Sequence, residues 1–307
     1  MSQLAFVFPG QGSQKPGMGA SFLDHPTGVE LFNRANERLG FDLKKLCLEG
    51  PVETLTLTQF AQPAILTVSS IAYQILSSQL GVKPLFVAGH SLGEYSALVA
   101  AGVLAFEDAV EAVYYRGLAM QEAVPVGVGA MAAVLGMEGP ELEALCAEEA
   151  KGQFVAPANY NCQGQIVISG DAEAVKRVLG RAKGKLLEVS APFHSPLMAP
   201  AAAKLAEKLK TLAFHDAVVP VMTNAENKAL NRAEDFLPSL VLQVTAPVRW
   251  ESGVHKMVAQ GVKGLVEFGE GKVLAGMAKR IDKTVPCLGF SGLGELEALK
   301  EQLQPYL

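Results

Sequence analysis

The residues Gly89-His90-Ser91-Leu92-Gly93 have the pattern of a serine nucleophile on a sharp turn between a strand and a helix. Such a turn leaves almost no room for side chains at its flanks, which accounts for the two glycines. The Ser91 hydroxyl would lie at the N-terminus of the helix, where main-chain N–H groups and the helix dipole stabilise a negative oxygen. A serine that only caps the helix is the alternative, but the predicted flanking strand and helix favour a nucleophile.

A serine nucleophile needs a base, because a free hydroxyl is almost never ionised at neutral pH. The chain has five histidines, at positions 25, 90, 194, 215 and 255. His194 is the preferred base, because it lies in a loop between a predicted strand and a predicted helix, where catalytic residues often lie. A loop histidine in solvent is the alternative interpretation. His90 follows the strand directly, and we expect it to support the turn or to touch the substrate.

No acidic residue is an obvious third member of a triad. Asp171 and Glu188 precede His194 in the chain, but both fall in a small inserted unit. A dyad of Ser91 and His194, oriented by a main-chain carbonyl or an amide, fits the sequence equally well.

Arg116 follows an apolar helical run over residues 110–115. Most arginines are exposed, so a surface residue at a helix end is one interpretation. The other is a guanidinium that binds a carboxylate through two parallel hydrogen bonds.

The elements around these residues alternate between strands and helices. Residues 4–8 and 85–88 are short apolar runs typical of buried parallel strands. A glycine-rich loop follows the first run, over residues 10–19, and residues 92–101 are predicted to form a helix that ends at Gly102. The sequence therefore predicts an α/β core with a central parallel sheet flanked by helices.

A second unit interrupts this core. The segments 130–135, 140–150, 154–159, 165–169, 172–182 and 185–189 are predicted as strand, helix, strand, strand, helix and strand. This β-α-β-β-α-β order is that of a ferredoxin-like subdomain. We expect a large domain over residues 1–126 and 196–307, and the small subdomain over residues 127–195.

The composition excludes several classes of protein. The 307 residues are 50 % apolar, and 26 Lys and Arg stand against 31 Asp and Glu, a net charge of −5. This charge does not favour nucleic acid, and no apolar run approaches the roughly 18 residues of a membrane span. Four scattered cysteines predict neither a disulfide framework nor a metal site. The glycine motifs lack the spacing of nucleotide-binding loops. We therefore expect a cytoplasmic protein without a cofactor, a nucleic-acid partner or membrane contact.

Several motifs together resemble the malonyl-CoA:acyl carrier protein transacylase family. They include Phe8-Pro9-Gly10-Gln11-Gly12-Ser13-Gln14, residues 89–97, Arg116-Gly117, Met120-Gln121, Asn161 with Gly164-Gln165, Phe193-His194-Ser195, Gln243 before residues 247–250, and residues 267–274. The matches cover nearly the whole chain in order. The resemblance implies a hydrolase-like core with the ferredoxin-like insertion.

The resemblance also implies a two-step acyl transfer. Ser91 would attack the thioester of malonyl-CoA, with His194 as the general base and the amide region of Gln243, through its carbonyl, holding the histidine. The main-chain N–H groups of Gln11 and Leu92 would stabilise the oxyanion. The phosphopantetheine thiol of holo acyl carrier protein would then take the malonyl group from the serine, which supplies fatty acid elongation.

Further residues of the family pattern would bind the substrate. Arg116 would pair with the malonyl carboxylate, and His90 and Asn161 would contact the substrate. Phe193 is the residue type of malonyl-selective relatives, whereas a serine there accompanies methylmalonyl selectivity. A monomer is typical of stand-alone relatives.

Two other functions remain open from the sequence. A serine esterase or thioesterase of the α/β-hydrolase type could share the turn at Ser91, although it would be expected to show a late histidine after an acid and an HGGG-like loop. A module that only binds carrier protein is the other alternative, but the presence of Ser91, His194 and Arg116 speaks against it.

Overall fold

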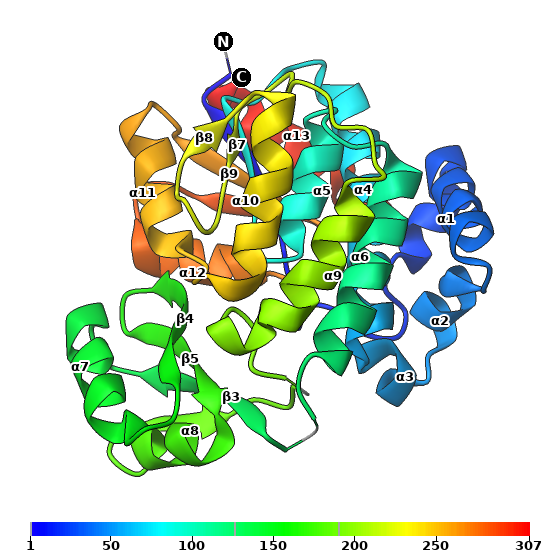
Figure 1. The fold of residues 1–307 in the computed structure, drawn as a ribbon. Helices are drawn as coiled ribbons and strands as arrows, with labels where there is room; N and C mark the ends of the chain where they lie inside the picture. The colour runs from blue at the N-terminus through cyan, green and yellow to red at the C-terminus, as the bar shows by residue number, and fades with distance from the viewer. Residues whose placement is uncertain (1, 126, 190) are drawn as a thin grey trace.

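The computed structural model describes residues 2–125, 127–189 and 191–307, and these form an α/β fold around two sheets (Figure 1). The larger sheet has the order β10-β9-β1-β2-β7-β8. Its strands pair in parallel except for β8, which joins the edge antiparallel to β7. The strands are β1 (Leu4–Phe8), β2 (Phe86–Gly89), β7 (Val221–Met222), β8 (Ala229–Leu230), β9 (Gly264–Phe268) and β10 (Cys287–Phe290).

Helices cover both faces of this sheet, which explains why its strands are apolar throughout. In β1, Leu4, Phe6 and Phe8 point into one core, whereas Ala5 and Val7 point into the core on the other face. The first core is built from α1 (Pro26–Leu39), α2 (Leu43–Glu49), α3 (Val52–Thr56), α4 (Thr58–Leu80), α5 (Gly93–Ala100), α6 (Phe106–Glu122), α9 (Ala199–Leu209), α10 (Ala233–Thr245) and α13 (Leu296–Leu303). The second is built from α11 (Trp250–Ala259) and α12 (Val273–Ile281). Short 3-10 helices cover Ala20–Asp24, Pro196–Met198, Leu293–Glu295 and Gln304–Tyr306.

The smaller sheet has the order β4-β5-β3-β6 and is antiparallel throughout. It consists of β3 (Gly129–Leu135), β4 (Val155–Cys162), β5 (Gln165–Asp171) and β6 (Gly184–Leu186), with α7 (Gly139–Ala150) and α8 (Ala172–Leu179) packed on one face. The predicted α/β core and the predicted β-α-β-β-α-β subdomain are thus both confirmed. The expected domain boundary at residue 126 lies outside the described residues, and the division into domains stays a prediction.

Among the strands of the subdomain, β4 and β6 differ most from the predicted bounds, each by three residues at its C-terminal end. β4 continues to Cys162 rather than ending at 159, because it pairs with β5 up to Gln165 and bends through two irregularities in register. β6 ends at Leu186 rather than reaching 189, because it is an exposed edge strand that, among the described residues, pairs with β3 alone. β4 also contacts the large domain, where Asn159 forms an isolated parallel bridge with Val248.

The carboxyl ends of the parallel strands meet at one edge of the larger sheet, below which the subdomain lies in Figure 1. Loops after β1, β2 and β7 therefore converge there, which is where ligands bind in open α/β sheets. In the part of the chain that the structure describes, no helix is both long and apolar enough to cross a membrane.

Candidate active site

Ser91 lies on the turn between β2 and α5, and this turn has no room for side chains at its flanks. A Cβ atom at Gly89 would lie 1.8 Å from the carbonyl carbon of Gly93, and one at Gly93 would lie 2.1 Å from the carbonyl oxygen of Phe8. Ser91 itself has a φ of 52°. A non-glycine residue pays about 1–3 kcal/mol for such a conformation, which persists where the surrounding structure enforces it.

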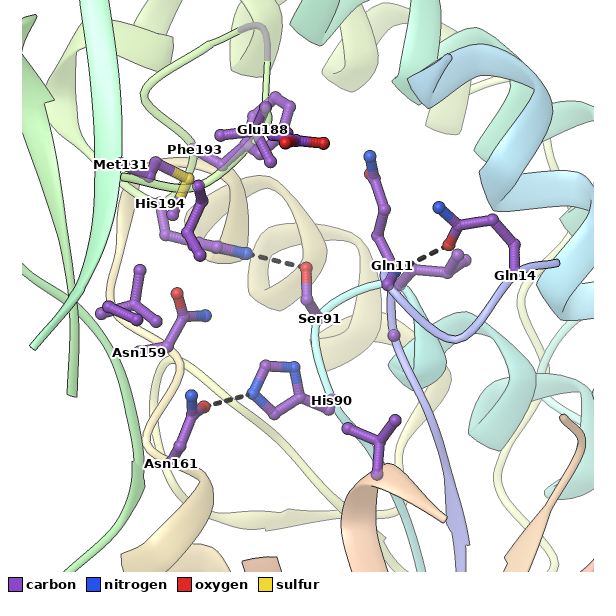
Figure 2. Close-up of a pocket in the computed structure, with 18 of the residues that line it drawn as sticks. Gln11, Gln14, His90, Ser91, Met131, Asn159, Asn161, Glu188, Phe193 and His194 are labelled. Atoms are coloured by element: carbon purple, nitrogen blue, oxygen red, sulfur yellow. Dashed lines mark hydrogen bonds between the residues drawn. The ribbon is translucent and has the colours of Figure 1, made fainter. Parts of the chain in front are cut away.

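His194 approaches Ser91 from the segment before the 3-10 helix Pro196–Met198. Its Nε2 atom lies 2.7 Å from Oγ of Ser91 (Figure 2). Its Nδ1 atom lies 2.9 Å from the main-chain oxygen of Gln243. A carbonyl oxygen can only accept, so Nδ1 carries the proton and Nε2 is free to accept from the serine hydroxyl. His194 also has a positive φ, of 56°. The two side chains therefore meet as a hydrogen-bonded pair oriented by a main-chain carbonyl.

The protonation state of His194 suits a base. The side chain is only 5 % exposed. Burial, reinforced by the positive charge of Arg116, lowers the pKa of His194 to about 3. The imidazole is therefore neutral at pH 7 and able to take a proton.

Arg116 lies on α6 and is buried, with 2 % of its surface exposed, so the alternative of a surface arginine is wrong. Its guanidinium donates to Oε1 of Gln62 at 2.7 Å, to Oε1 of Gln243 at 3.1 Å and to Oγ of Ser91 at 3.2 Å. Its Nε atom has no partner, and no carboxylate forms an ion pair with it among the described residues. A buried cation thus lies beside the hydroxyl with only neutral acceptors.

The loop after β1 places the Gln11 main chain against the turn at Ser91. Its approach depends on Gly10, where a Cβ atom would lie 2.5 Å from the carbonyl oxygen of His90. The N–H groups of Gln11 and Leu92 have no acceptor among the described residues, whereas the N–H of Ser91 donates to Oδ1 of Asn224 at 2.6 Å. The main-chain N–H groups of Gln11 and Leu92 are therefore available to donate to an oxyanion.

These groups line a cavity of about 380 Å³ between the larger sheet and the subdomain. Nε2 of His90 lies 2.8 Å from Oδ1 of Asn161, which comes from β4 (Figure 2). The wall of the cavity is otherwise largely apolar and includes Phe193 and Met131. This volume lies within the range of small-molecule sites, about 300–1,000 Å³.

The other candidates from the sequence lie elsewhere or have other contacts. Asp171 accepts a hydrogen bond from the N–H of Phe154, and His25 caps the start of α1. Glu188 lines the cavity but forms no hydrogen bond with His194 among the described residues. In the same residues, no group of three or more His, Cys, Asp or Glu side chains could hold a metal ion.

Comparison with known proteins decides the family. The family model described as acyl transferase domain matches residues 5–271 of this chain. The malonyl CoA-acyl carrier protein transacylase of Escherichia coli K12 is 46 % identical over 311 residues, covering 99 % of this chain and 100 % of the relative. The chain belongs to the malonyl-CoA:acyl carrier protein transacylase family.

Solved structures agree with this assignment. An acyl carrier protein S-malonyltransferase from Vibrio cholerae superposes with a TM-score of 0.94 at 43 % identity, covering 97 % of this chain and 100 % of that one. A malonyl-transacylase solved in complex with its type II PKS acyl-carrier protein has a TM-score of 0.95 at 42 % identity, covering 98 % and 100 %.

One further residue of the candidate site was not predicted from the sequence. Asn224, just after β7, accepts from the N–H of Ser91 and donates to the carbonyl oxygen of Gly89 at 2.6 Å. Its own N–H donates to the buried carboxyl of Glu94 at 2.8 Å. Burial raises the pKa of Glu94 to about 7. Asn224 thus braces both sides of the serine turn, and no motif signals it, since it lies 133 residues from Ser91 in the chain.

The lowered pKa of His194 predicts an unusual pH profile for the transacylase. The imidazole acts as a base only when neutral, and a histidine with the ordinary pKa near 6.5 would be ~97 % protonated at pH 5. With a pKa of about 3, His194 stays neutral there. We expect the rate of serine acylation, measured by rapid-quench mass spectrometry, to stay nearly constant from pH 7.5 to pH 5. Because Glu94 also has a pKa of about 7, an acid limb centred between pH 6 and 7 that persists in the Glu94→Gln variant would contradict the shift.

Proposed function

We propose that this protein transfers the malonyl group from malonyl-CoA to the phosphopantetheine thiol of holo acyl carrier protein, through a malonyl ester on Ser91, and so supplies fatty acid elongation. In the first step Nε2 of His194 takes the hydroxyl proton while Oγ attacks the thioester carbonyl. The oxyanion accepts from the N–H groups of Gln11 and Leu92, each such donor contributing about 3 kcal/mol. When the intermediate collapses, coenzyme A leaves with the proton from His194.

The second step reverses these roles. The thiol of the carrier protein gives its proton to His194 and attacks the ester carbonyl. Ser91 then leaves and takes the proton back, which restores the free enzyme. The carbonyl of Gln243 keeps the imidazole in the required tautomer in both directions.

The observation that carries the proposal is the buried, unneutralised charge of Arg116 beside the nucleophile. Its Nη2 atom lies 3.2 Å from Oγ of Ser91, and Nε has no hydrogen-bond partner in the part of the chain that the structure describes. A malonyl group on the serine would place its terminal carboxylate within reach of the guanidinium, whereas an acetyl group has no carboxylate to pair with it. Losing one partner of such a buried pair costs about 2–5 kcal/mol. Arg116 therefore selects the malonyl donor.

The cavity wall supports further parts of the proposal. Phe193 lines the cavity next to His194 and would occupy the space of an α-methyl group. His90 and Asn161, hydrogen-bonded to each other, would contact the acyl or pantetheine portion of the substrate.

We also propose a cytoplasmic monomer. All the side chains assigned to the reaction come from one chain, so the site needs no second copy. The cysteines at positions 47, 146, 162 and 287 are free, which fits a reducing compartment.

Intact-protein mass spectrometry tests the function. Incubation with malonyl-CoA should add one malonyl group, located on Ser91 by peptide mapping, and holo carrier protein should remove it with formation of malonyl carrier protein. Apo carrier protein, which lacks the thiol, is the matched control. Rapid release of free malonate without carrier protein would instead indicate a thioesterase, and the absence of an adduct would indicate a binding module.

A further inference from the structure

We propose that Gln62 is a specificity-determining residue, which orients Arg116 with a neutral amide so that the guanidinium charge stays available for the acyl carboxylate. The inference rests on the proposed function, since it concerns the same carboxylate pair. The preference for a malonyl donor then depends on the neutral side chain of Gln62 as well as on Arg116 itself.

Gln62 reaches Arg116 because two helices approach each other closely. Gln62 lies on α4 and Arg116 on α6, and the next residue of α6 is Gly117. A Cβ atom at Gly117 would lie 2.5 Å from the Cα atom of Gln59, one turn before Gln62. Gly117 therefore allows the backbones of α4 and α6 to approach closely, and the side chain of Gln62 reaches the guanidinium across the space between them.

The amide of Gln62 has a defined orientation. Its Oε1 atom accepts from Nη1 of Arg116 at 2.7 Å, and its Nε2 atom donates to Sδ of Met120 at 3.9 Å. Since a guanidinium has only donors, the oxygen must face it. Gln62 is 1 % exposed, so the contact is shielded from water and holds the fork in place.

The neutrality of Gln62 matters because a carboxylate at its position would form an ion pair with the buried guanidinium of Arg116. The other side-chain amide on the fork, that of Gln243, is neutral as well, and its Nε2 atom donates to the carbonyl oxygen of Ser91 at 3.0 Å. Glu94 is the buried acid whose charge acts on Arg116, but its carboxyl accepts from the N–H of Asn224 instead. The free enzyme thus keeps the guanidinium positioned without an ion pair that the substrate would have to break.

The substitution Gln62→Glu tests this inference, since it exchanges an amide for a carboxylate of nearly the same shape. The new carboxylate would pair with Arg116 and compete with the acyl carboxylate. We expect the ratio of kcat/KM for malonyl-CoA over acetyl-CoA to fall by roughly 30-fold or more, the range for a buried charge pair. Gln79→Glu is the matched control, because Gln79 is exposed on the same helix and the change in net charge is identical.

A purely structural role for Gln62 makes a different prediction. It would lower the rates for both donors in parallel and leave their ratio unchanged, and that result would overturn the inference. A second variant, Gln62→Met, removes the acceptor without adding charge. Here we expect KM to rise more for malonyl-CoA than for acetyl-CoA, so that the malonyl preference falls, but by less than in Gln62→Glu. An equal change in KM for both donors would also count against the inference, and this test applies even where Gln62→Glu does not fold.

The arginine separates this inference from the proposed function. If Arg116→Met does not reduce the malonyl-to-acetyl ratio, the carboxylate pair itself is absent and the proposed selectivity fails. If Arg116→Met reduces the ratio and Gln62→Glu does not, the pair stands and only the role of Gln62 is refuted.

Discussion

Replacing Ser91 by alanine is expected to abolish the malonyl adduct and to lower transfer to carrier protein by between about 10⁴- and 10⁶-fold, the range for removing a nucleophilic serine. The reason is that, among the described residues, no other hydroxyl hydrogen-bonds to His194: its Nε2 atom lies 2.7 Å from this oxygen, and Nδ1 is occupied by the Gln243 carbonyl. The remaining activity would come from binding and from the oxyanion donors alone. Intact-protein mass spectrometry and a steady-state transfer assay measure the two effects.

The same variant should keep its fold, which can be checked by thermal unfolding. Alanine and serine bear similar costs at the φ of 52°, and the brace formed by Asn224 contacts only main-chain atoms of residues 89 and 91. A malonyl adduct on another residue of the variant, discharged by carrier protein at the normal rate, would remove Ser91 from the mechanism.

Replacing Arg116 by methionine is expected to lower kcat/KM for malonyl-CoA by roughly 30- to 4000-fold, since about 2–5 kcal/mol of a buried charge pair is lost. Acetyl transfer should fall much less. It is not expected to stay unchanged, because Arg116 also donates to Oγ of Ser91 at 3.2 Å, a contact that both donors share. The informative quantity is therefore the ratio of the two specificity constants.

Two controls accompany this variant. Arg116→Lys keeps the charge but loses the fork, so it should recover part of the malonyl preference. The charge of Arg116 also contributes to the low pKa of His194, so the acid limb of the Arg116→Met profile should move to higher pH. Equal losses for malonyl and acetyl donors would argue that the arginine is structural.

Features that depend on neighbours in the chain could be predicted from the sequence. The two glycines around Ser91 are required by contacts within a few residues of the turn and with the adjacent strand, so their spacing, together with the predicted flanking strand and helix, indicated a nucleophile. The order of strands and helices in the subdomain followed from hydrophobic periodicity, because each element buries one face. Strand ends were less well predicted, as for β4 and β6, because an end depends on where the partner strand stops.

The chemistry of the site depended on contacts between distant segments, which a pattern in one segment cannot express. His194 lies 103 residues from Ser91, and Gln62 lies 54 residues from Arg116. Local composition left His194 open as a solvent residue and Arg116 open as a surface one, until the packing of α4, α6 and α10 buried them together. Asn224 could not be predicted from the sequence, because its contacts with the serine turn also join distant segments. The sequence by itself thus determined the strand–turn–helix that presents the hydroxyl, since steric exclusion acts locally. Only the tertiary structure decided which base, which orienting carbonyl and which unneutralised cation surround it, because burial and charge arise from segments that meet through folding.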